Sequence, residues 1–173
     1  NRGEIARRIA RTCRSLGIEV VAVYSDADQD APFVAEADEA VRIGPAPSAE
    51  SYLRIDAIVD AAKRTGAQAI HPGYGLLSEN PDFVDACDQN GITFIGPKAA
   101  TMRALGDKAS SRRVAMEAGV PVIPATEVLG DDMAAIKKEA AEVGYPLMLK
   151  ASWGGGGRGM RPIFSEDEVE EKV

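Results

Sequence analysis

Short apolar runs rich in β-branched residues alternate with helical patterns through residues 1–103, and this alternation constrains the fold more than any other feature. The apolar runs predict buried strands at 18–25, 40–44, 67–73 and 92–97. Apolar residues three and four positions apart predict helices at 5–16, 52–66 and 80–91. Alternation of this kind indicates βαβ units and a mostly parallel sheet. We therefore expect an α/β, Rossmann-like first domain.

The pattern changes after about residue 103. It predicts two further helices, a strand and a second extended segment, at 106–119, 132–144, 146–152 and 160–164. Ser165 and Glu168 have the spacing of a capping box before a further helix. We expect residues 104–173 to form the beginning of an α+β domain. Because the chain opens on Asn1 and closes in an unfinished helical pattern, we also expect it to be a fragment of a longer polypeptide.

Three loops carry distinctive residues, at 1–4, 71–79 and 96–98. Predicted strands lead into the second and third, and we expect a strand to precede the first. Ligands of parallel α/β sheets bind at the carboxyl ends of the strands. These loops are therefore the first candidates for a binding site.

Composition excludes several classes of function. The formal net charge is −7 and no stretch of Lys or Arg forms a basic tract, which argues against a nucleic-acid partner. No apolar segment approaches the length of a membrane span. Cys13 and Cys87 match no metal-ligand spacing, and we expect two free thiols in a reducing compartment.

The segment KASWGGGGRGMR, residues 150–161, places five glycines in six positions directly after a predicted strand. Met160 and Arg161 occupy the positions where a P-loop requires Lys and Ser or Thr, so that motif fails. The dinucleotide pattern G-x-G-x-x-G is present, but no helix follows it. We favour a glycine-rich hairpin whose backbone amides approach phosphate oxygens and which closes as a lid. The alternative is a flexible surface loop without a ligand.

Five motifs in order, NRGEIARRI, IHPGYGLLSEN, FIGPK, MRALGDK and KASWGGGGRGMR, resemble the biotin carboxylase component of biotin-dependent carboxylases. The resemblance extends over essentially the whole chain. It implies a pre-ATP-grasp domain at 1–103 and a truncated ATP-grasp domain at 104–173. It also implies a ligase that uses ATP, Mg²⁺ and bicarbonate to carboxylate biotin on a carrier domain.

The resemblance assigns roles to individual residues. It implies that Lys108 and Lys150 contact the nucleotide, that Met160 contacts the adenine ring, and that the lid is formed by Gly154, Gly155, Gly156, Gly157 and Gly159. A second group belongs to a loop beside biotin: His71, Gly73, Tyr74, Gly75 and Glu79. For His71 we favour a hydrogen-bonded scaffold role. The catalytic residues and the Mg²⁺ ligands are expected beyond Val173, so we expect no carboxylase activity from this piece alone.

The resemblance also implies partners. These are a biotin carboxyl carrier domain, a carboxyltransferase domain or subunit, and a second copy of the chain, met through Arg8 and Arg11 of the first helix. We favour pyruvate as the final acceptor, with the acyl-CoA carboxylases as the alternative. The expected location is the cytoplasm, or the mitochondrial matrix in a eukaryote. Two other possibilities are a carbamoyl-phosphate-synthetase-like or carboxylate–amine ligase and a non-catalytic nucleotide-binding subunit.

Overall fold

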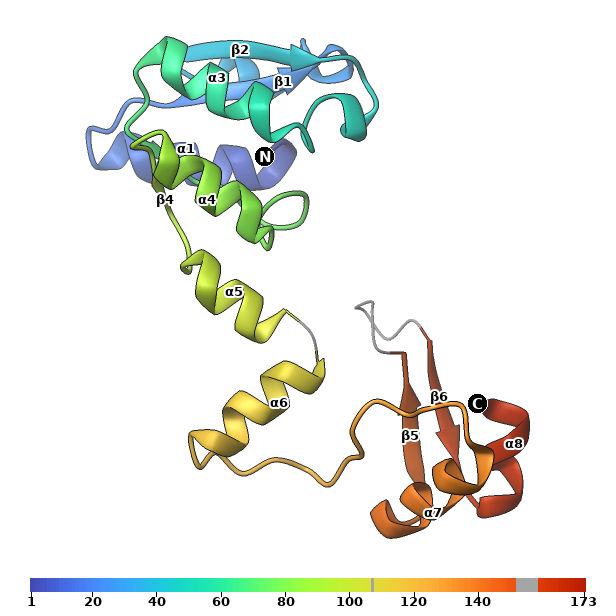
Figure 1. Cartoon of the computed structure of the whole chain (residues 1–173). Helices are drawn as coiled ribbons and strands as arrows, with labels where there is room; N and C mark the ends of the chain where they lie inside the picture. The colour runs from blue at the N-terminus through green and yellow to red at the C-terminus, as the bar shows by residue number, and fades with distance from the viewer. Residues whose placement is uncertain (107, 152–158) are drawn as a thin grey trace. The chain divides into compact units, whose positions relative to one another are not determined.

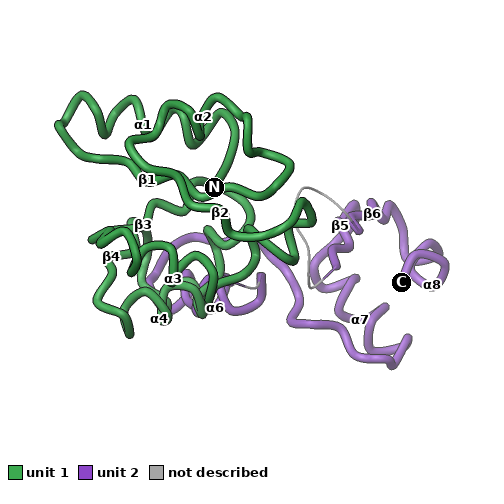
Figure 2. Tube along the Cα trace, turned by 90° about the horizontal axis from the view of Figure 1, so that it is seen from above, with its two compact units in different colours: residues 1–103 green, residues 104–173 purple. Residues whose placement is uncertain are grey.

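The computed structural model describes residues 1–106, 108–151 and 159–173, which divide into two compact units (Figures 1 and 2). The first unit comprises Asn1–Arg103 and the second Ala104–Val173. Gly154–Gly157 of the expected lid lie outside the described residues.

The first unit follows the expected alternation of helices and strands. Its helices are α1 (Gly3–Ser15), α2 (Pro32–Ala35), α3 (Ile55–Thr65), α4 (Pro81–Gln89) and, crossing into the second unit, α5 (Ala99–Leu105). Its strands are β1 (Val21–Ser25), β2 (Glu39–Gly44), β3 (Ala69–Ile70) and β4 (Thr93–Phe94). Two 3₁₀ turns complete it, η1 (Asp26–Asp28) and η2 (Ser48–Glu50).

The strands of the first unit pair in parallel, as the alternation predicts. β1 pairs with β2 from Val21↔Glu39 onward, and β3 pairs with β4 through Ile70↔Phe94. They form two two-stranded sheets. α1 and α2 lie on one side of these strands and α3 and α4 on the other (Figure 2). The family of folds expected from the sequence, an α/β fold with parallel strands, is therefore confirmed.

Glycines end three of the helices where the sequence places them. Gly17, Gly66 and Gly91 follow α1, α3 and α4 with φ of +70°, +69° and +68°. This left-handed conformation closes a helix and is strained for residues that carry a Cβ. Asn80 caps α4 at the other end, because its side chain accepts hydrogen bonds from the amides of Asp82 and Phe83.

Several element boundaries differ from the prediction. The strands expected at 67–73 and 92–97 shorten to two residues each, and the helix expected from 52 begins at Ile55. Tyr52 is excluded from that helix because its ring packs into the core and its hydroxyl bonds to Asp28. The short helix α2 and the helix α5 were not predicted.

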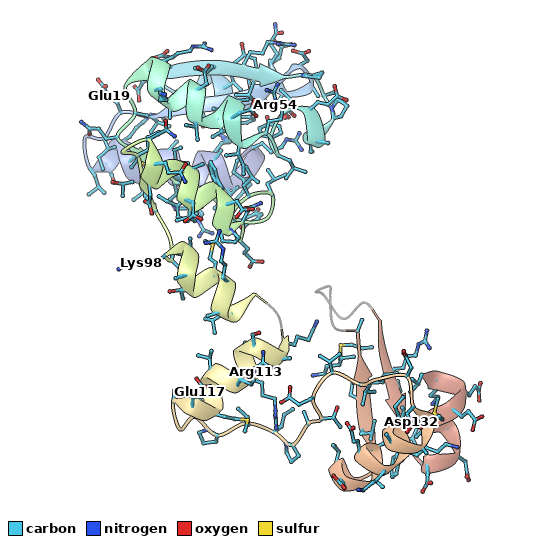
Figure 3. All side chains as sticks on the ribbon, in the orientation of Figure 1. Glu19, Arg54, Lys98, Arg113, Glu117 and Asp132 are labelled. Carbon is cyan, nitrogen blue, oxygen red and sulfur yellow. The ribbon has the colours of Figure 1, made fainter. Side chains whose placement is uncertain are left out.

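The second unit contains α6 (Lys108–Glu117), α7 (Met133–Val143), β5 (Leu147–Lys150), β6 (Met160–Ile163), η3 (Glu166–Glu168) and α8 (Val169–Lys172). β5 and β6 pair antiparallel. Asp132, labelled at the start of α7 in Figure 3, caps that helix by accepting from the Ala134 amide. The capping box does not form as expected, because Glu168 accepts from the Phe164 amide and no Ser165 side-chain cap bond is present.

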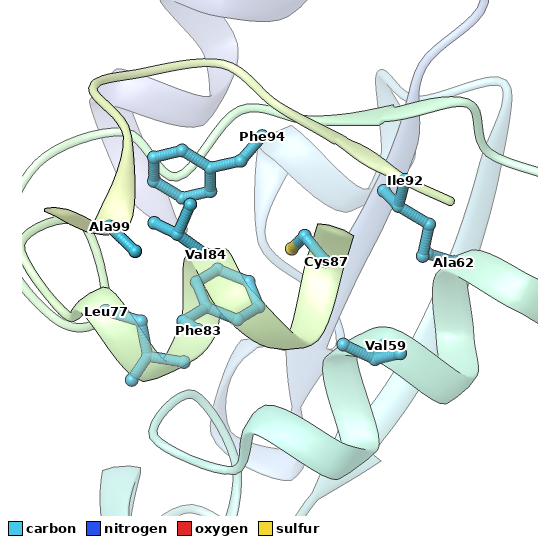
Figure 4. Close-up of a cluster of buried hydrophobic side chains, with 9 residues drawn as sticks. All are labelled: Val59, Ala62, Leu77, Phe83, Val84, Cys87, Ile92, Phe94 and Ala99. Carbon is cyan, nitrogen blue, oxygen red and sulfur yellow. The ribbon is translucent and has the colours of Figure 1, made fainter. Parts of the chain in front are cut away.

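Three apolar clusters hold the described residues together. The largest packs α4 against α3 and β4, and its two rings, Phe83 and Phe94, meet edge to face with centroids 5.8 Å apart (Figure 4). Smaller clusters join β2 to α3 and, in the second unit, α7 to β6 and α8.

Both cysteines are free thiols. Cys87 is fully buried in the largest cluster, and this burial raises the pKa of its thiol to about 11, whereas Cys13 is half-buried. No described helix has the length and apolar character needed to cross a membrane.

Candidate functional site

The β5–β6 hairpin separates its side chains onto two faces. Leu147 and Leu149 point toward the apolar cluster around α7. Lys150 is directly opposite Met160 in the antiparallel register, so the two share the other face. Both side chains are exposed, Met160 by 44%. The hairpin therefore presents an ammonium group and a flexible apolar side chain next to each other, at the end where β5 leads into the glycine tract.

Lys108 reaches the same end of the hairpin from the first residue of α6. Its Nζ donates a hydrogen bond of 3.2 Å to the carbonyl oxygen of Ala151, the residue that follows Lys150. The contact spans 43 positions of sequence. The two lysines that the resemblance assigns to the nucleotide thus come from separate segments to one place.

The two strands of the hairpin remain close together where they lead into the glycine tract. Ala151 donates its amide to the Gly159 carbonyl at 3.2 Å. Gly159 has φ +72°, and a Cβ there would lie 3.0 Å from the Cβ of Ala151. Both the backbone conformation and the close approach require glycine at this position.

The loop between β3 and α4 contains the second group of candidates. Gly73 and Gly75 have φ of +70° and +63°, and the non-glycine residue Leu76 shares this left-handed conformation with φ +50°. The next residue, Leu77, is buried in the largest cluster and anchors the loop. Tyr74 and Glu79 are exposed, Tyr74 by 62%. The loop therefore projects a flat aromatic side chain from an anchored base.

His71 bonds within its own loop. Its Nδ1 accepts a hydrogen bond from the Gly73 amide at 3.0 Å. Desolvation lowers the pKa of the imidazole. A ring nitrogen that accepts a backbone bond favours the neutral tautomer with its proton on Nε2. This contact is of the kind expected for a scaffold histidine.

Sequence patterns missed a residue that contacts this loop. The Nδ2 of Asn1 donates to the carbonyl oxygens of Pro72, at 2.8 Å, and Tyr74, at 2.6 Å. Residues 1–4 and 71–79 were both candidate loops, and the expected shared edge of a parallel sheet is the signal that connects them. The partner atoms on Pro72 and Tyr74 are backbone atoms, which no side-chain motif identifies.

A polar network whose acceptor, Asp28, is buried lies next to Asn1. Arg2 donates to Asp28 through Nε, at 2.7 Å, and through Nη2. Asp28 also accepts from the hydroxyls of Tyr52, at 2.7 Å, and Ser25, at 3.2 Å. The Arg2 guanidinium, followed by the two hydroxyls, holds the pKa of the Asp28 carboxyl below its usual range. Burial raises the pKa of Tyr52.

The first helix carries exposed arginines, of which Arg7 pairs with Glu36 through Nη2 and Oε1 at 2.6 Å. Arg8 and Arg11 are exposed.

Among the residues that the structure describes, no group of three or more His, Cys, Asp or Glu side chains could hold a metal ion.

Two family models match the chain, each within one unit. The model described as biotin carboxylase, N-terminal domain, matches residues 1–102. The model described as carbamoyl-phosphate synthase L chain, ATP binding domain, matches residues 107–173.

Similar proteins come from several kinds of carboxylase. The chain is 56% identical over 99% of its length to the alpha chain of the mitochondrial methylcrotonoyl-CoA carboxylase of Glycine max and 55% identical over 100% to the biotin carboxylase of Haemophilus influenzae. It is 54% identical over 98% to one of the pyruvate carboxylase subunits of Methanothermobacter thermautotrophicus. The chain spans 23%, 39% and 34% of the lengths of these three relatives.

Solved structures agree with the sequence matches. A complex of biotin carboxylase from Campylobacter jejuni with β,γ-ATP has a TM-score of 0.92 and 48% identity, covering 99% of this chain and 39% of that one. The biotin carboxylase domain dimer of the Hydrogenobacter thermophilus 2-oxoglutarate carboxylase, with MgADP, ADP and bicarbonate, has a TM-score of 0.89 and 48% identity, covering 99% and 38%.

Proposed function

Because the chain belongs to the biotin carboxylase N-terminal domain family, we propose that it is part of a ligase that carboxylates biotin on a carrier domain with ATP, Mg²⁺ and bicarbonate. The observation that carries the proposal is the hydrogen bond from Lys108 to the carbonyl of Ala151, the residue that follows Lys150. Both lysines lie in the segment that matches an ATP-binding family model. The nucleotide and bicarbonate in the similar structures support the same cofactors here.

The residues at the hairpin fit a nucleotide. Two ammonium groups provide point charges for phosphate oxygens, and phosphoryl transfer requires such neutralisation. Met160 provides an apolar contact for the adenine ring next to Lys150. Gly159 allows the backbone to turn without a side chain in the way. We assign the lid to Gly159 together with the glycines at 154–157, and the biotin side to His71, Gly73, Tyr74, Gly75 and Glu79.

The experiment is ATP cleavage by the full-length polypeptide that contains this chain, with Mg²⁺, bicarbonate and free biotin. Lys150→Ala and Lys108→Ala should each raise the KM for ATP about 10- to 100-fold, because a hydrogen bond to a charged group contributes roughly 1.5–3 kcal/mol. Lys138→Ala is the matched control, since Lys138 is an exposed lysine of α7 in the same unit. Unchanged kinetics in both site variants would contradict the nucleotide assignment. Nucleotide binding without biotin-dependent turnover would instead indicate a non-catalytic subunit.

We propose pyruvate as the final acceptor, with an acyl-CoA as the second candidate. The pyruvate carboxylase relative supports the first, and the methylcrotonoyl-CoA carboxylase relative supports the second. Supplying the complete enzyme with pyruvate or with methylcrotonoyl-CoA, and measuring fixation of labelled bicarbonate, distinguishes them.

The proposed partners are the carrier domain, a carboxyltransferase and a second copy of the chain. The dimer of biotin carboxylase domains among the similar structures supports the last of these. Arg8 and Arg11 on α1 are the proposed contacts with the second copy. Charge reversal at both should shift the sedimentation of the full-length protein from dimer toward monomer. The proposed location is the bacterial cytoplasm or, as for the relative named mitochondrial, the mitochondrial matrix.

A further inference from the structure

The side chain of Asn1 joins two segments more than seventy positions apart. Its two Nδ2 hydrogens have two acceptors, the carbonyl oxygens of Pro72 and Tyr74, at 2.8 and 2.6 Å. Its Oδ1 accepts from the Arg2 amide at 2.9 Å. Since two carbonyls face the nitrogen and an amide faces the oxygen, the orientation of the side-chain amide is determined by its partners. Both polar atoms of the side chain are used.

Gly73, the residue between the two carbonyls, is in close contact with Asn1. A Cβ on Gly73 would lie 2.8 Å from the Cβ and 2.9 Å from the Cγ and Nδ2 of Asn1. Its φ of +70° already favours glycine. The loop backbone is thus packed directly onto the side chain of Asn1, with no room for a side chain between them.

Asn1 in turn is next to a residue that the core holds in place. Arg2 is bonded to Asp28, whose carboxylate also accepts from Tyr52 and Ser25 and which is only 6% exposed. The Tyr52 hydroxyl accepts from the Ser25 amide at 3.0 Å, which closes the network. Asp28, Ser25 and Tyr52 are buried, whereas the Arg2 side chain is about half exposed. Bonded polar groups in a buried site are rigid. The network therefore fixes the start of the chain to which Asn1 belongs.

We propose that Asn1 is a positioning residue that sets the place of Tyr74 in the loop facing biotin, an inference that rests on the proposed function. Asn1 bonds to the carbonyls on both sides of Gly73, one of them that of Tyr74 itself. Its Nδ2 ties this backbone to the start of the chain, where the neighbouring Arg2 is bonded to Asp28. Leu77 anchors the other end of the loop in the apolar core. The position of the exposed Tyr74 ring is thereby fixed relative to the core of the first unit. Loss of the donors frees the loop and weakens the use of biotin, not of ATP.

The test uses Asn1→Asp and Asn1→Ala in the full-length enzyme. Asn1→Asp keeps the size of the side chain but replaces the donating Nδ2 with a carboxylate oxygen that repels the two carbonyls. Asn90→Ala is the matched control, because the Nδ2 of Asn90 also donates to a backbone carbonyl, that of Ala86 at 2.8 Å, at the end of α4. We expect kcat/KM for free biotin to fall about 10- to 100-fold in Asn1→Asp and less in Asn1→Ala. The KM for ATP should stay within about twofold in all three variants.

Hydrogen exchange provides a second measurement that is independent of activity. Peptides covering 71–79 should exchange faster in Asn1→Asp than in the wild type, whereas peptides covering α3 should not change. If exchange at 71–79 and the biotin kinetics both match the wild type, the positioning role is wrong. An equal loss for biotin and ATP would indicate a general structural role and would also overturn it. A wild-type enzyme without biotin-dependent ATP cleavage would overturn the proposed function, and the exchange experiment would still decide whether Asn1 holds the loop.

Discussion

The two units differ in how they hold their candidate residues. In Asn1–Arg103, the loop at 71–79 is held by a buried apolar cluster at one end and, through Asn1, by a buried polar network at the other. In Ala104–Val173, one smaller cluster supports the hairpin with Lys150, and α6, which carries Lys108, has no buried residue among those described. Much of the apolar surface around α6 is exposed, including Met116 by 51% and Ile123 by 76%.

This difference indicates which candidate residues are held in fixed positions and which can move. The first unit contains the contacts needed to fix its loop. In the second unit the hairpin is anchored on one face only, and the exposed face bears Lys150 and Met160. A hairpin anchored on one face only can move, as the proposed lid requires, whereas a loop fixed at both ends presents a constant surface.

The largest expected effect tests the core of the first unit. Phe83 is 2% exposed and packs edge to face on Phe94. Phe83→Ala should lower the free energy of unfolding by about 3–5 kcal/mol, because it leaves a cavity in a packed cluster. Met116→Ala on α6 is the contrasting variant and should change it by less than about 1 kcal/mol. Urea unfolding monitored by circular dichroism measures both. Equal losses would mean that α6 is packed as firmly as α4 and would break the comparison.

The next effect concerns the polar network. Asp28→Asn removes the charge that Arg2 pairs with and should cost about 2–3 kcal/mol of unfolding free energy. Because its partners lower the pKa of Asp28 in the folded state, the stability it contributes is present above the unfolded value near 3.8 and is lost as the pH falls through that value toward the folded pKa. The difference between wild type and variant should therefore shrink below about pH 4. A difference that is constant from pH 7 to pH 3 would contradict this assignment.

Local sequence signals predicted much of the fold. Helix ends at Gly17, Gly66 and Gly91 were predicted because glycine adopts positive φ without strain, and the strand pairs were predicted to be parallel from their alternation with helices. The lengths of β3 and β4 were not, because pairing ends where the backbones diverge, which a pattern of apolar residues does not record. Tyr52 fits a helical pattern, but its buried hydroxyl bond to Asp28 keeps it outside α3.

In the candidate site, too, local sequence patterns identified some residues, whereas contacts formed only by folding were not predicted. A resemblance in motifs identified Lys108, Lys150 and the HPGYG loop. The hydrogen bond from Lys108 to Ala151 and the clamp of Asn1 on Pro72 and Tyr74 depend on backbone oxygens that are brought close only by folding. Sequence patterns can bring two loops to one edge of a sheet, but they do not identify which atoms pair, because every residue has a carbonyl.

The helix caps allow a matched comparison between the units. Asn80 accepts from two amides at the start of α4, and Asp132 accepts from one at the start of α7. Each substitution to Ala should cost about 1 kcal/mol, with Asn80→Ala the larger because it leaves two donors without their acceptor. Thermal unfolding of both variants, with Lys138→Ala at an exposed position inside α7 as a non-capping control, measures the effect. A larger loss from Asp132→Ala would show that the second unit depends more on local helix stability than on its cluster.

The smallest effect concerns an exposed ion pair of the second unit. Lys137 on α7 donates to Glu170 on α8 at 2.9 Å, and this contact joins two elements of the cluster from the outside. Solvent and salt screen such a pair, so Lys137→Gln should lower the melting temperature by less than either cap substitution. The matched variant is Arg64→Gln in the first unit, which breaks the pair with Asp60 within α3. Because the Lys137 pair joins separate elements of the less buried unit, we expect its loss to be the larger of the two at low salt.

In about 1 M NaCl both losses should disappear, since the screening length falls to about 3 Å. A loss at Lys137 that persists in high salt would mean that its aliphatic stem, rather than its charge, stabilises the packing of α7 on α8.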